Sequence, residues 1–203
     1  MKESFWQEYF SIPNIMGYFR IVLAVLYVWA FYLSLDGAPY WPVIAIIVVS
    51  GLTDFFDGKI ARKFHMVTDW GKMLDPIADK VTIGAIILSL MFKYKIMMPM
   101  IVLYIIKEGY MALAGTLLIK KGHKIEGAKI YGKVCTFATY LILLAILLLP
   151  KMNDGIVVRL IVINMMVMVY AFVRYIIYYG KLFKECSENT VEAESSNLLN
   201  NFY

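Results

Sequence analysis

The stretch DFFDGKIARKFHMVTDWGKMLDPIAD, residues 54–79, carries four carboxylates at helical spacings. Asp54 and Asp57 are three residues apart, and Asp75 and Asp79 are four apart. Residues three or four apart share one face of a helix, so each pair presents both acids on the same side. A glycine and a basic run separate the pairs, so the chain can turn there. Such a turn would bring the two acidic faces together.

Four converging carboxylates repel one another unless a cation lies among them. Hard divalent ions such as Mg²⁺, Mn²⁺ or Ca²⁺ prefer oxygen ligands, and two of them ~3.5–4 Å apart are common in phosphoryl chemistry. His and Cys are absent at ligand spacing here, which argues against zinc. The alternative is that the acids cap helices or lie at the surface, which suits Asp69 but not two facing pairs. We therefore expect a site for two ions, Mg²⁺ or Mn²⁺, with the ligands Asp54, Asp57, Asp75 and Asp79.

The composition is that of a membrane protein, because 61% of the 203 residues are hydrophobic. The net charge of +5 comes from bases at the ends of apolar runs, a pattern that indicates membrane loops rather than a nucleic-acid surface. A spanning helix needs ~20 apolar residues. Six runs are candidates: 16–35, 41–58, 72–92, 97–119, 131–150 and 156–178.

These runs predict an all-α integral membrane protein with six transmembrane helices. Residues 2–10 mix aromatic and charged side chains, so they indicate either an N-terminal amphipathic helix on the membrane surface, which we expect, or a frayed terminus. We divide the chain into the amphipathic segment 1–15, a six-helix catalytic domain 16–180, and a polar, disordered tail 181–203. The connections that follow the second and fourth runs are rich in Lys and Arg, which places them in the cytoplasm. Both termini and all four acids then face the cytoplasm, at the inner side of the cell membrane.

At these residues the chain resembles the CDP-alcohol phosphatidyltransferases. The family signature has two Asp separated by two residues, then Gly, two residues, Ala-Arg, eight residues, Gly, three residues, Asp, three residues and Asp. Every spacing is kept here, at Asp54, Asp57, Gly58, Ala61, Arg62, Gly71, Asp75 and Asp79. The match covers 26 residues directly, and the six-run pattern extends the resemblance over most of the chain.

The resemblance implies one reaction type, in which an alcohol attacks the lipid-side phosphorus of CDP-diacylglycerol and CMP leaves. It also implies that Asp79 is the general base and that the protein forms a homodimer. Gly58 and Gly71 would let the backbone approach the nucleotide, Ala61 would keep that face small, and Arg62 would bind the pyrophosphate. Alone, the glycines would equally suit close helix packing.

Basic residues elsewhere suggest an acceptor alcohol that carries its own phosphate. Lys107 lies inside an apolar run next to Glu108, where it either forms a buried ion pair or reaches an anionic substrate. The other candidates could equally extend toward the membrane surface. The candidate acceptor-binding residues are Arg20, Lys107, Lys129 and Lys133.

Within the family, the opening IPNIMGYFRI most resembles the bacterial members that use glycerol 3-phosphate and make phosphatidylglycerophosphate. Two departures leave the acceptor open. Gly17 stands where those members usually have Thr, and Lys107 stands where they commonly have Arg. Lys cannot reproduce the bidentate grip of Arg on phosphate. Phosphatidylglycerol, an inositol phosphate and serine are therefore alternative acceptors.

Two other classes of function fit parts of the pattern. Acids inside a membrane can line a pore, so a divalent-cation transporter is one alternative. All four acids cluster at one end, however, whereas a conduit needs polar groups through its full depth. A scaffold that has lost catalysis is the other alternative, and the complete set of acids argues against it.

Overall fold

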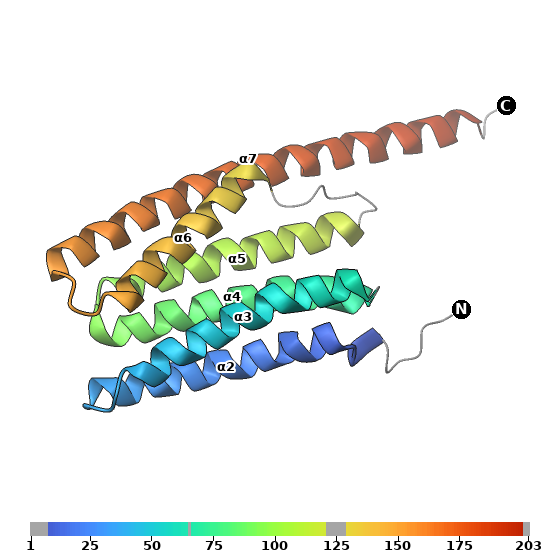
Figure 1. Ribbon diagram of the computed structural model, residues 1–203. Helices are drawn as coiled ribbons and strands as arrows, with labels where there is room; N and C mark the ends of the chain where they lie inside the picture. Colours follow the sequence, from blue (N-terminus) through green and yellow to red (C-terminus); the bar gives the residue numbers. More distant parts are fainter. Residues whose placement is uncertain (1–7, 65, 121–128, 201–203) are drawn as a thin grey trace. The chain divides into compact units, whose positions relative to one another are not determined.

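The computed structural model describes residues 8–64, 66–120 and 129–200, with side chains up to residue 185. Every regular element in these ranges is an α-helix (Figure 1). The long helices are α2 (Ile12–Leu35), α3 (Trp41–Lys63), α4 (Asp69–Lys93), α5 (Met97–Lys120), α6 (Ile130–Leu148) and α7 (Asp154–Asn200). Five of the six apolar runs of the sequence are therefore helical throughout, and the run 131–150 is helical up to Leu148.

Four of these helices are long and apolar enough to cross a membrane: α2, α5, α6 and the Asp154–Glu185 part of α7. Large apolar side chains point outward from them, with Trp29 62%, Leu113 68% and Phe137 65% exposed. In water such a surface drives association, whereas lipid covers it without cost. The chain is thus an all-α membrane protein. Charged residues interrupt the apolar sequences of α3 and α4, so six spans are not established by length and composition.

The structure describes the two ends of the chain to different extents. Residues 1–7, which hold much of the expected amphipathic helix, lie outside the described residues. At the other end, α7 continues to Asn200, where the polar composition indicated a disordered tail. The segment after Gly180 contains neither Pro nor Gly, and its four Glu and three Leu are good helix formers.

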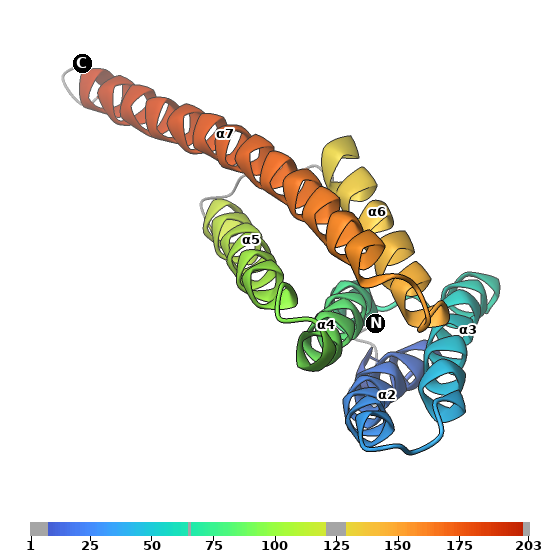
Figure 2. The same ribbon diagram turned by 90° about the vertical axis from the view of Figure 1, so that its left-hand side faces the viewer.

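The chain forms two compact units, residues 1–101 with 143–152 and residues 102–142 with 153–203. In the first unit, α2 packs against both α3 and α4 (Figure 2). The buried residues of α2 recur every three or four positions, and Gly17, Arg20, Ala24 and Tyr27 are among them. This spacing makes one continuous stripe along the helix. The stripe places the charged side chain of Arg20 between apolar neighbours and toward the partner helices.

A glycine lets α2 and α4 approach closely. A Cβ atom on Gly17 would lie 2.8 Å from Cδ2 of Leu74, which is closer than real Cβ contacts. Leu74 is itself buried, as is Ala78 one turn further along α4. Gly17, which the sequence analysis noted as a departure from the usual Thr, therefore lets these two helices pack closely.

The second unit has its core where tyrosines of α7 meet α5 and α6. Tyr175 and Tyr179 form a buried cluster with Ala114 and Leu118 of α5. A Cβ atom on Gly132 of α6 would lie 1.9 Å from the Tyr175 hydroxyl oxygen, so only glycine fits there. Elsewhere in the unit, the buried hydroxyl of Thr139 donates to Oδ1 of Asn164 over 3.0 Å. This hydrogen bond satisfies two polar side chains that would be costly to bury alone.

Candidate active site

The four signature aspartates lie at the facing ends of two helices. Asp54 and Asp57 lie in the second half of α3, and Asp75 and Asp79 lie in the first half of α4. On α3, Asp57 continues the buried face formed by Val43, Ile47 and Ser50. On α4, the two acids are one turn apart, so both point to the same side. The sequence therefore predicted the local direction of each pair correctly from its spacing.

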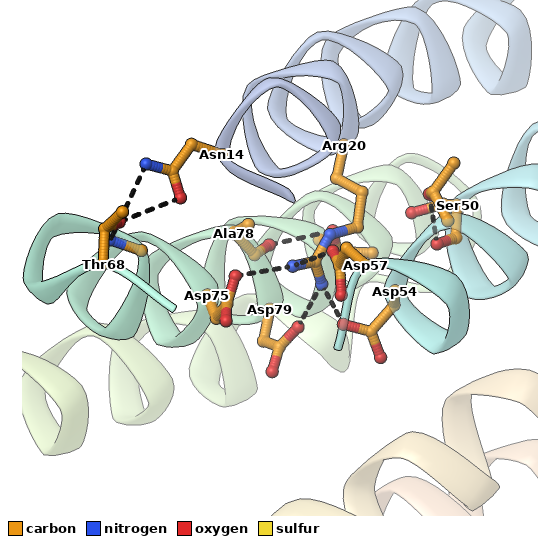
Figure 3. Close-up of polar contacts among 12 residues, drawn as sticks. Asn14, Arg20, Ser50, Asp54, Asp57, Thr68, Asp75, Ala78 and Asp79 are labelled. Atoms are coloured by element: carbon orange, nitrogen blue, oxygen red, sulfur yellow. Dashed lines mark hydrogen bonds and ion pairs between the residues drawn. The ribbon is translucent and has the colours of Figure 1, made fainter. Parts of the chain in front are cut away.

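A single guanidinium group from α2 joins the two pairs (Figure 3). Nη1 of Arg20 donates to Oδ1 of Asp54 and, over 2.7 Å, to Oδ1 of Asp79. Nη2 donates to Oδ1 of Asp75 over 3.5 Å and lies 3.2 Å from Oδ2 of Asp57. The contact with Asp57 has the distance of an ion pair but not the alignment of a hydrogen bond, since this oxygen has no hydrogen-bond partner. Each nitrogen thus bridges one acid of α3 and one acid of α4.

The burial of the cluster is strongly asymmetric. The Arg20 and Asp57 side chains are 2% and 4% exposed, whereas those of Asp54, Asp75 and Asp79 are 52%, 51% and 53% exposed. The guanidinium group therefore approaches the acids from the protein interior. The three half-exposed carboxylates have a second side that dissolved ions and substrates can reach.

The start of α4 is fixed by a capping residue and by the beginning of α2. Thr68 is the N-cap, and its hydroxyl oxygen accepts a hydrogen bond from the backbone N–H of Gly71 over 3.0 Å. Asn14 donates from Nδ2 to the same hydroxyl oxygen over 3.1 Å, and this contact is buried. A Cβ atom on Gly71 would lie 2.6 Å from Oδ1 of Asn14. Gly71 therefore leaves the room that Asn14 occupies at the first turn of α4.

Residues just before α2 add further contacts to this helix start. The backbone N–H of Trp70 donates to Oε1 of Glu8 over 2.9 Å, and Trp70 Nε1 donates to the Tyr18 hydroxyl over 2.6 Å. The rings of Tyr9 and Trp70 are 5.2 Å apart. Asp69 lies at the surface, where its hydrogen bond and ion pair with Lys72 hold the pKa of Asp69 below its ordinary value. Its role as a surface charge at a helix end agrees with the interpretation of the sequence.

The other residues of the signature lie close to Asp54 along α3. Gly58 is one turn and Arg62 two turns after Asp54, so the three share a face. The exposed Arg62 donates from Nε to the carbonyl oxygen of Gly58 over 2.9 Å. A Cβ atom on Gly58 would have only one neighbour within 4 Å, Nη2 of Arg62 at 3.8 Å. Ala61 is partly exposed beside them.

Arg20 belongs to the first unit, and the other three acceptor candidates belong to the second unit. Lys107 is 3% exposed, and its Nζ lies 2.7 Å from Oε1 of Glu108, so the buried ion pair is present. Nζ of Lys129 lies 4.6 Å from the ring centroid of Tyr178, and Lys133 is exposed. Arg20 instead lies within contact distance of all four signature acids. The sequence offered one signal for this, since a cation inside an apolar run requires an anionic partner.

Asn14 and Thr68 also belong to the site, and the sequence analysis selected neither of them. Both are buried polar residues, and they meet across 54 positions of the chain. Asn14 follows the Ile-Pro break before the first apolar run, and Thr68 precedes the acid Asp69. A Thr before a helix is an ordinary capping signal. Nothing in the sequence pairs it with Asn14, because that contact depends on how α2 lies against α4.

A helical membrane protein that gathers four carboxylates at the ends of two helices has the architecture of a membrane enzyme. The model of the CDP-alcohol phosphatidyltransferase family matches residues 10–177, so the chain belongs to this family of enzymes. The match extends well beyond the 26-residue signature and includes both units.

Two Rickettsia relatives with curated names align with nearly the whole chain, and a third relative aligns with 37% of it. A CDP-diacylglycerol–glycerol-3-phosphate 3-phosphatidyltransferase of Rickettsia felis is 32% identical over 178 residues, which are 88% of this chain and 96% of the relative. The protein of the same name from Rickettsia typhi is 30% identical over 176 residues, 87% of this chain and 97% of the relative. The one from Escherichia coli K12 is 39% identical over 75 residues, 37% of this chain and 41% of the relative.

Enzymes of this family generally use divalent metal ions. The donor chemistry of the site fits such ions, because all four side chains offer carboxylate oxygens and already surround one cation. Among the residues that the structure describes, no three Asp, Glu, His or Cys side chains meet at the spacing of metal ligands. The group that lies among the acids is the guanidinium of Arg20.

Proposed function

We propose that this enzyme transfers the phosphatidyl group of CDP-diacylglycerol to glycerol 3-phosphate, giving phosphatidylglycerophosphate and CMP. The observation that carries the proposal is the convergence of the four signature acids on one cation. The names of the Rickettsia relatives, which align with nearly the whole chain, support the choice of donor and acceptor.

The four acids take different parts in the reaction. Asp54, Asp57 and Asp75 bind two Mg²⁺ or Mn²⁺ ions, with Asp79 as a further ligand. When bound, these ions neutralise the negative charge of the pyrophosphate. Asp79 takes the proton of the acceptor hydroxyl as general base. The hydroxyl oxygen forms a bond to the lipid-side phosphorus, the bond from that phosphorus to the CMP oxygen breaks, and CMP leaves.

The nucleotide and pyrophosphate bind along the exposed face of α3. Arg62 offers a planar fork of donors suited to phosphate oxygens, two turns from Asp54. Gly58 lies between them and presents no side chain, so a ligand can reach the backbone there. Ala61 keeps the adjoining surface low, and Gly71 holds the first turn of α4 in place beside the ligand. The exposure of Arg62 and the hydrogen bond from its Nε to Gly58 support this arrangement.

The acceptor is bound by basic side chains, of which Lys107 is the strongest candidate. A buried ammonium group that keeps one carboxylate partner can still attract a phosphate. Lys129 and Lys133 are further candidates, and Arg20 has a different role that is described below. Lys107 and Gly17 depart from the usual residues of the members that use glycerol 3-phosphate, so the acceptor needs a direct test.

We place all six long helices across the membrane, with the acids and both termini on the cytoplasmic side. The residues 16–180 then form one catalytic domain, and the active protein is a homodimer, as is usual for the family. Lys and Arg are concentrated in the connections after α3 and α5, which supports this orientation. A cysteine-labelling test from the two sides of sealed vesicles would check it.

The decisive experiment uses the purified chain in detergent micelles with CDP-diacylglycerol and Mg²⁺. Labelled glycerol 3-phosphate is compared with phosphatidylglycerol, an inositol phosphate and serine, and both CMP release and labelled lipid are scored. We expect a lipid product and equimolar CMP with glycerol 3-phosphate alone. Product only with another alcohol would change the acceptor, whereas no CMP release with any alcohol would overturn the proposed reaction.

A further inference from the structure

The guanidinium group of Arg20 contacts each signature acid through one oxygen. These are Oδ1 of Asp54, Asp75 and Asp79 and Oδ2 of Asp57. Nη1 spans Asp54 and Asp79, and Nη2 spans Asp57 and Asp75, so each nitrogen ties α3 to α4. A planar fork with two such nitrogens fixes both the distance and the rotation of the carboxylates that it joins.

The contacts come from the interior side of the cluster. Arg20 is 2% exposed, whereas three of its four partners are about half exposed. A carboxylate has two oxygens, and the guanidinium engages one of them in each group. The half-exposed acids therefore keep a second oxygen for a cation that arrives from solvent. Outer partners of this kind commonly orient the ligands of a metal ion.

We propose that Arg20 is the positioning residue of the divalent-ion site, because it holds one oxygen of each acid from the interior and leaves the second oxygen of the half-exposed Asp54, Asp75 and Asp79 for the metal. This inference rests on the proposed function, which assigns the four acids as metal ligands. Without the guanidinium, four carboxylates would repel one another and the half-exposed three would turn toward water. Metal binding would then have to bring the four carboxylates back together against their mutual repulsion.

The charge of Arg20 alone would act in the opposite direction. A cation near the site disfavours a second cation, so its removal would strengthen metal binding if charge were the main effect. The sign of the change in affinity therefore separates a positioning role from simple competition for the same oxygens. The fourfold contact and the interior approach favour the positioning role.

The test measures Mn²⁺ binding to the purified full chain in detergent, from the electron paramagnetic resonance signal of free Mn²⁺. Wild type, Arg20→Gln, Arg20→Lys and Lys72→Gln are compared after treatment with EDTA. We expect Arg20→Gln to weaken Mn²⁺ binding by about 10- to 100-fold, as for other outer partners of metal ligands. Arg20→Lys keeps the charge but lacks the fork, so it should recover only part of the affinity.

Lys72→Gln is the matched control, because it removes a positive charge from the same unit. Lys72 is exposed and pairs with Asp69 rather than with the signature acids. We expect its Mn²⁺ affinity to stay within about twofold of wild type, since exposed charges are screened by salt. Thermal unfolding of each variant, with and without Mn²⁺, reports folding separately. If Arg20→Gln does not fold, the Mn²⁺ affinity of Arg20→Lys relative to that of wild type tests the positioning role instead.

Three results overturn the inference, and they are distinguishable. Mn²⁺ affinity that is unchanged or increased in both Arg20 variants, with normal binding by wild type, removes the positioning role and leaves the proposed metal site intact. Absence of Mn²⁺ binding in wild type and all variants removes the metal site itself, and the positioning role with it. A loss of thermal stability without a change in Mn²⁺ affinity likewise overturns the inference, since it shows a merely structural role.

Discussion

Nη1 of Arg20 lies 2.7 Å from Oδ1 of Asp79, although the two residues are 59 positions apart in the chain. Asp79 is the acid that we propose as general base, and the same nitrogen also contacts Asp54 on the other helix. A hydrogen bond from a guanidinium group favours the ionised form of a carboxylate. The contact therefore orients the carboxylate that we propose as the base.

Asp79→Asn is expected to abolish turnover while leaving CDP-diacylglycerol bound. An amide has nearly the same shape as the carboxylate but cannot take the proton, and loss of a general base commonly costs about 10²–10⁴-fold in rate. CMP release measures the rate, and a thermal shift with CDP-diacylglycerol measures binding. Asp69→Asn, which changes an exposed acid of the same helix, should keep the normal rate. Near-normal turnover of Asp79→Asn would exclude this residue as the base.

Asp57→Asn is expected to weaken Mn²⁺ binding more than it weakens folding. Its side chain is 4% exposed and lies 3.2 Å from Nη2 of Arg20, so the change removes one negative charge from a buried carboxylate that we propose as a metal ligand. The remaining three acids still balance the guanidinium, which limits the loss of stability. A titration with Mn²⁺ gives the affinity and a melting curve gives the stability. An unchanged affinity would remove Asp57 from the set of ligands.

Gly71→Ala is expected to destabilise the protein by about 1–3 kcal/mol, the usual cost of overfilling a packed site. The new methyl group would lie 2.6 Å from Oδ1 of Asn14, which must move away from the start of α4. Denaturant titration in detergent micelles measures the change.

Two further variants test the reason for this loss. Gly51→Ala on α3 has no neighbour within 4 Å and should be neutral or slightly stabilising. Asn14→Ala combined with Gly71→Ala removes the crowded side chain and should recover part of the stability. If the double variant is as unstable as the sum of the two single variants, crowding is not the cause.

Lys107→Gln is expected to raise the KM for glycerol 3-phosphate by about tenfold, because it removes a buried charge that attracts the acceptor phosphate. The KM for CDP-diacylglycerol should stay the same. Lys120→Gln, at the exposed end of the same helix, provides the control for a general effect of charge. An equal rise in both KM values would indicate instead that the Lys107–Glu108 pair maintains the fold of the second unit.

The helices and the direction of the acids could be predicted from the sequence, because both depend on local spacing. Pro13 and Pro42 mark the starts of α2 and α3, and the intervals of three and four residues put each pair of acids on one face. The role of Arg20 could not be predicted in the same way. It depends on the rotation of α2 against two other helices, which side-chain packing such as that of Gly17 on Leu74 decides.

The C-terminal end shows how a helix can continue beyond its apolar segment. The polar segment after Gly180 lacks apolar periodicity, which indicates disorder, yet it contains neither Pro nor Gly, the two residues least compatible with a helix. A helix that is already formed can add such residues without a new nucleation step. The continuation of α7 to Asn200 follows from this, and it has no counterpart in the pattern of hydrophobic residues.

The burial of Arg20 also bears on how the protein is made. During synthesis the arginine leaves the ribosome 34 residues before Asp54 and 59 residues before Asp79. Until α3 and α4 follow, α2 carries a positive charge within an apolar segment and has no counter-ion, which disfavours its release into lipid. The first helix therefore gains its full stability in the bilayer only when the last of the four acids has been added to the growing chain.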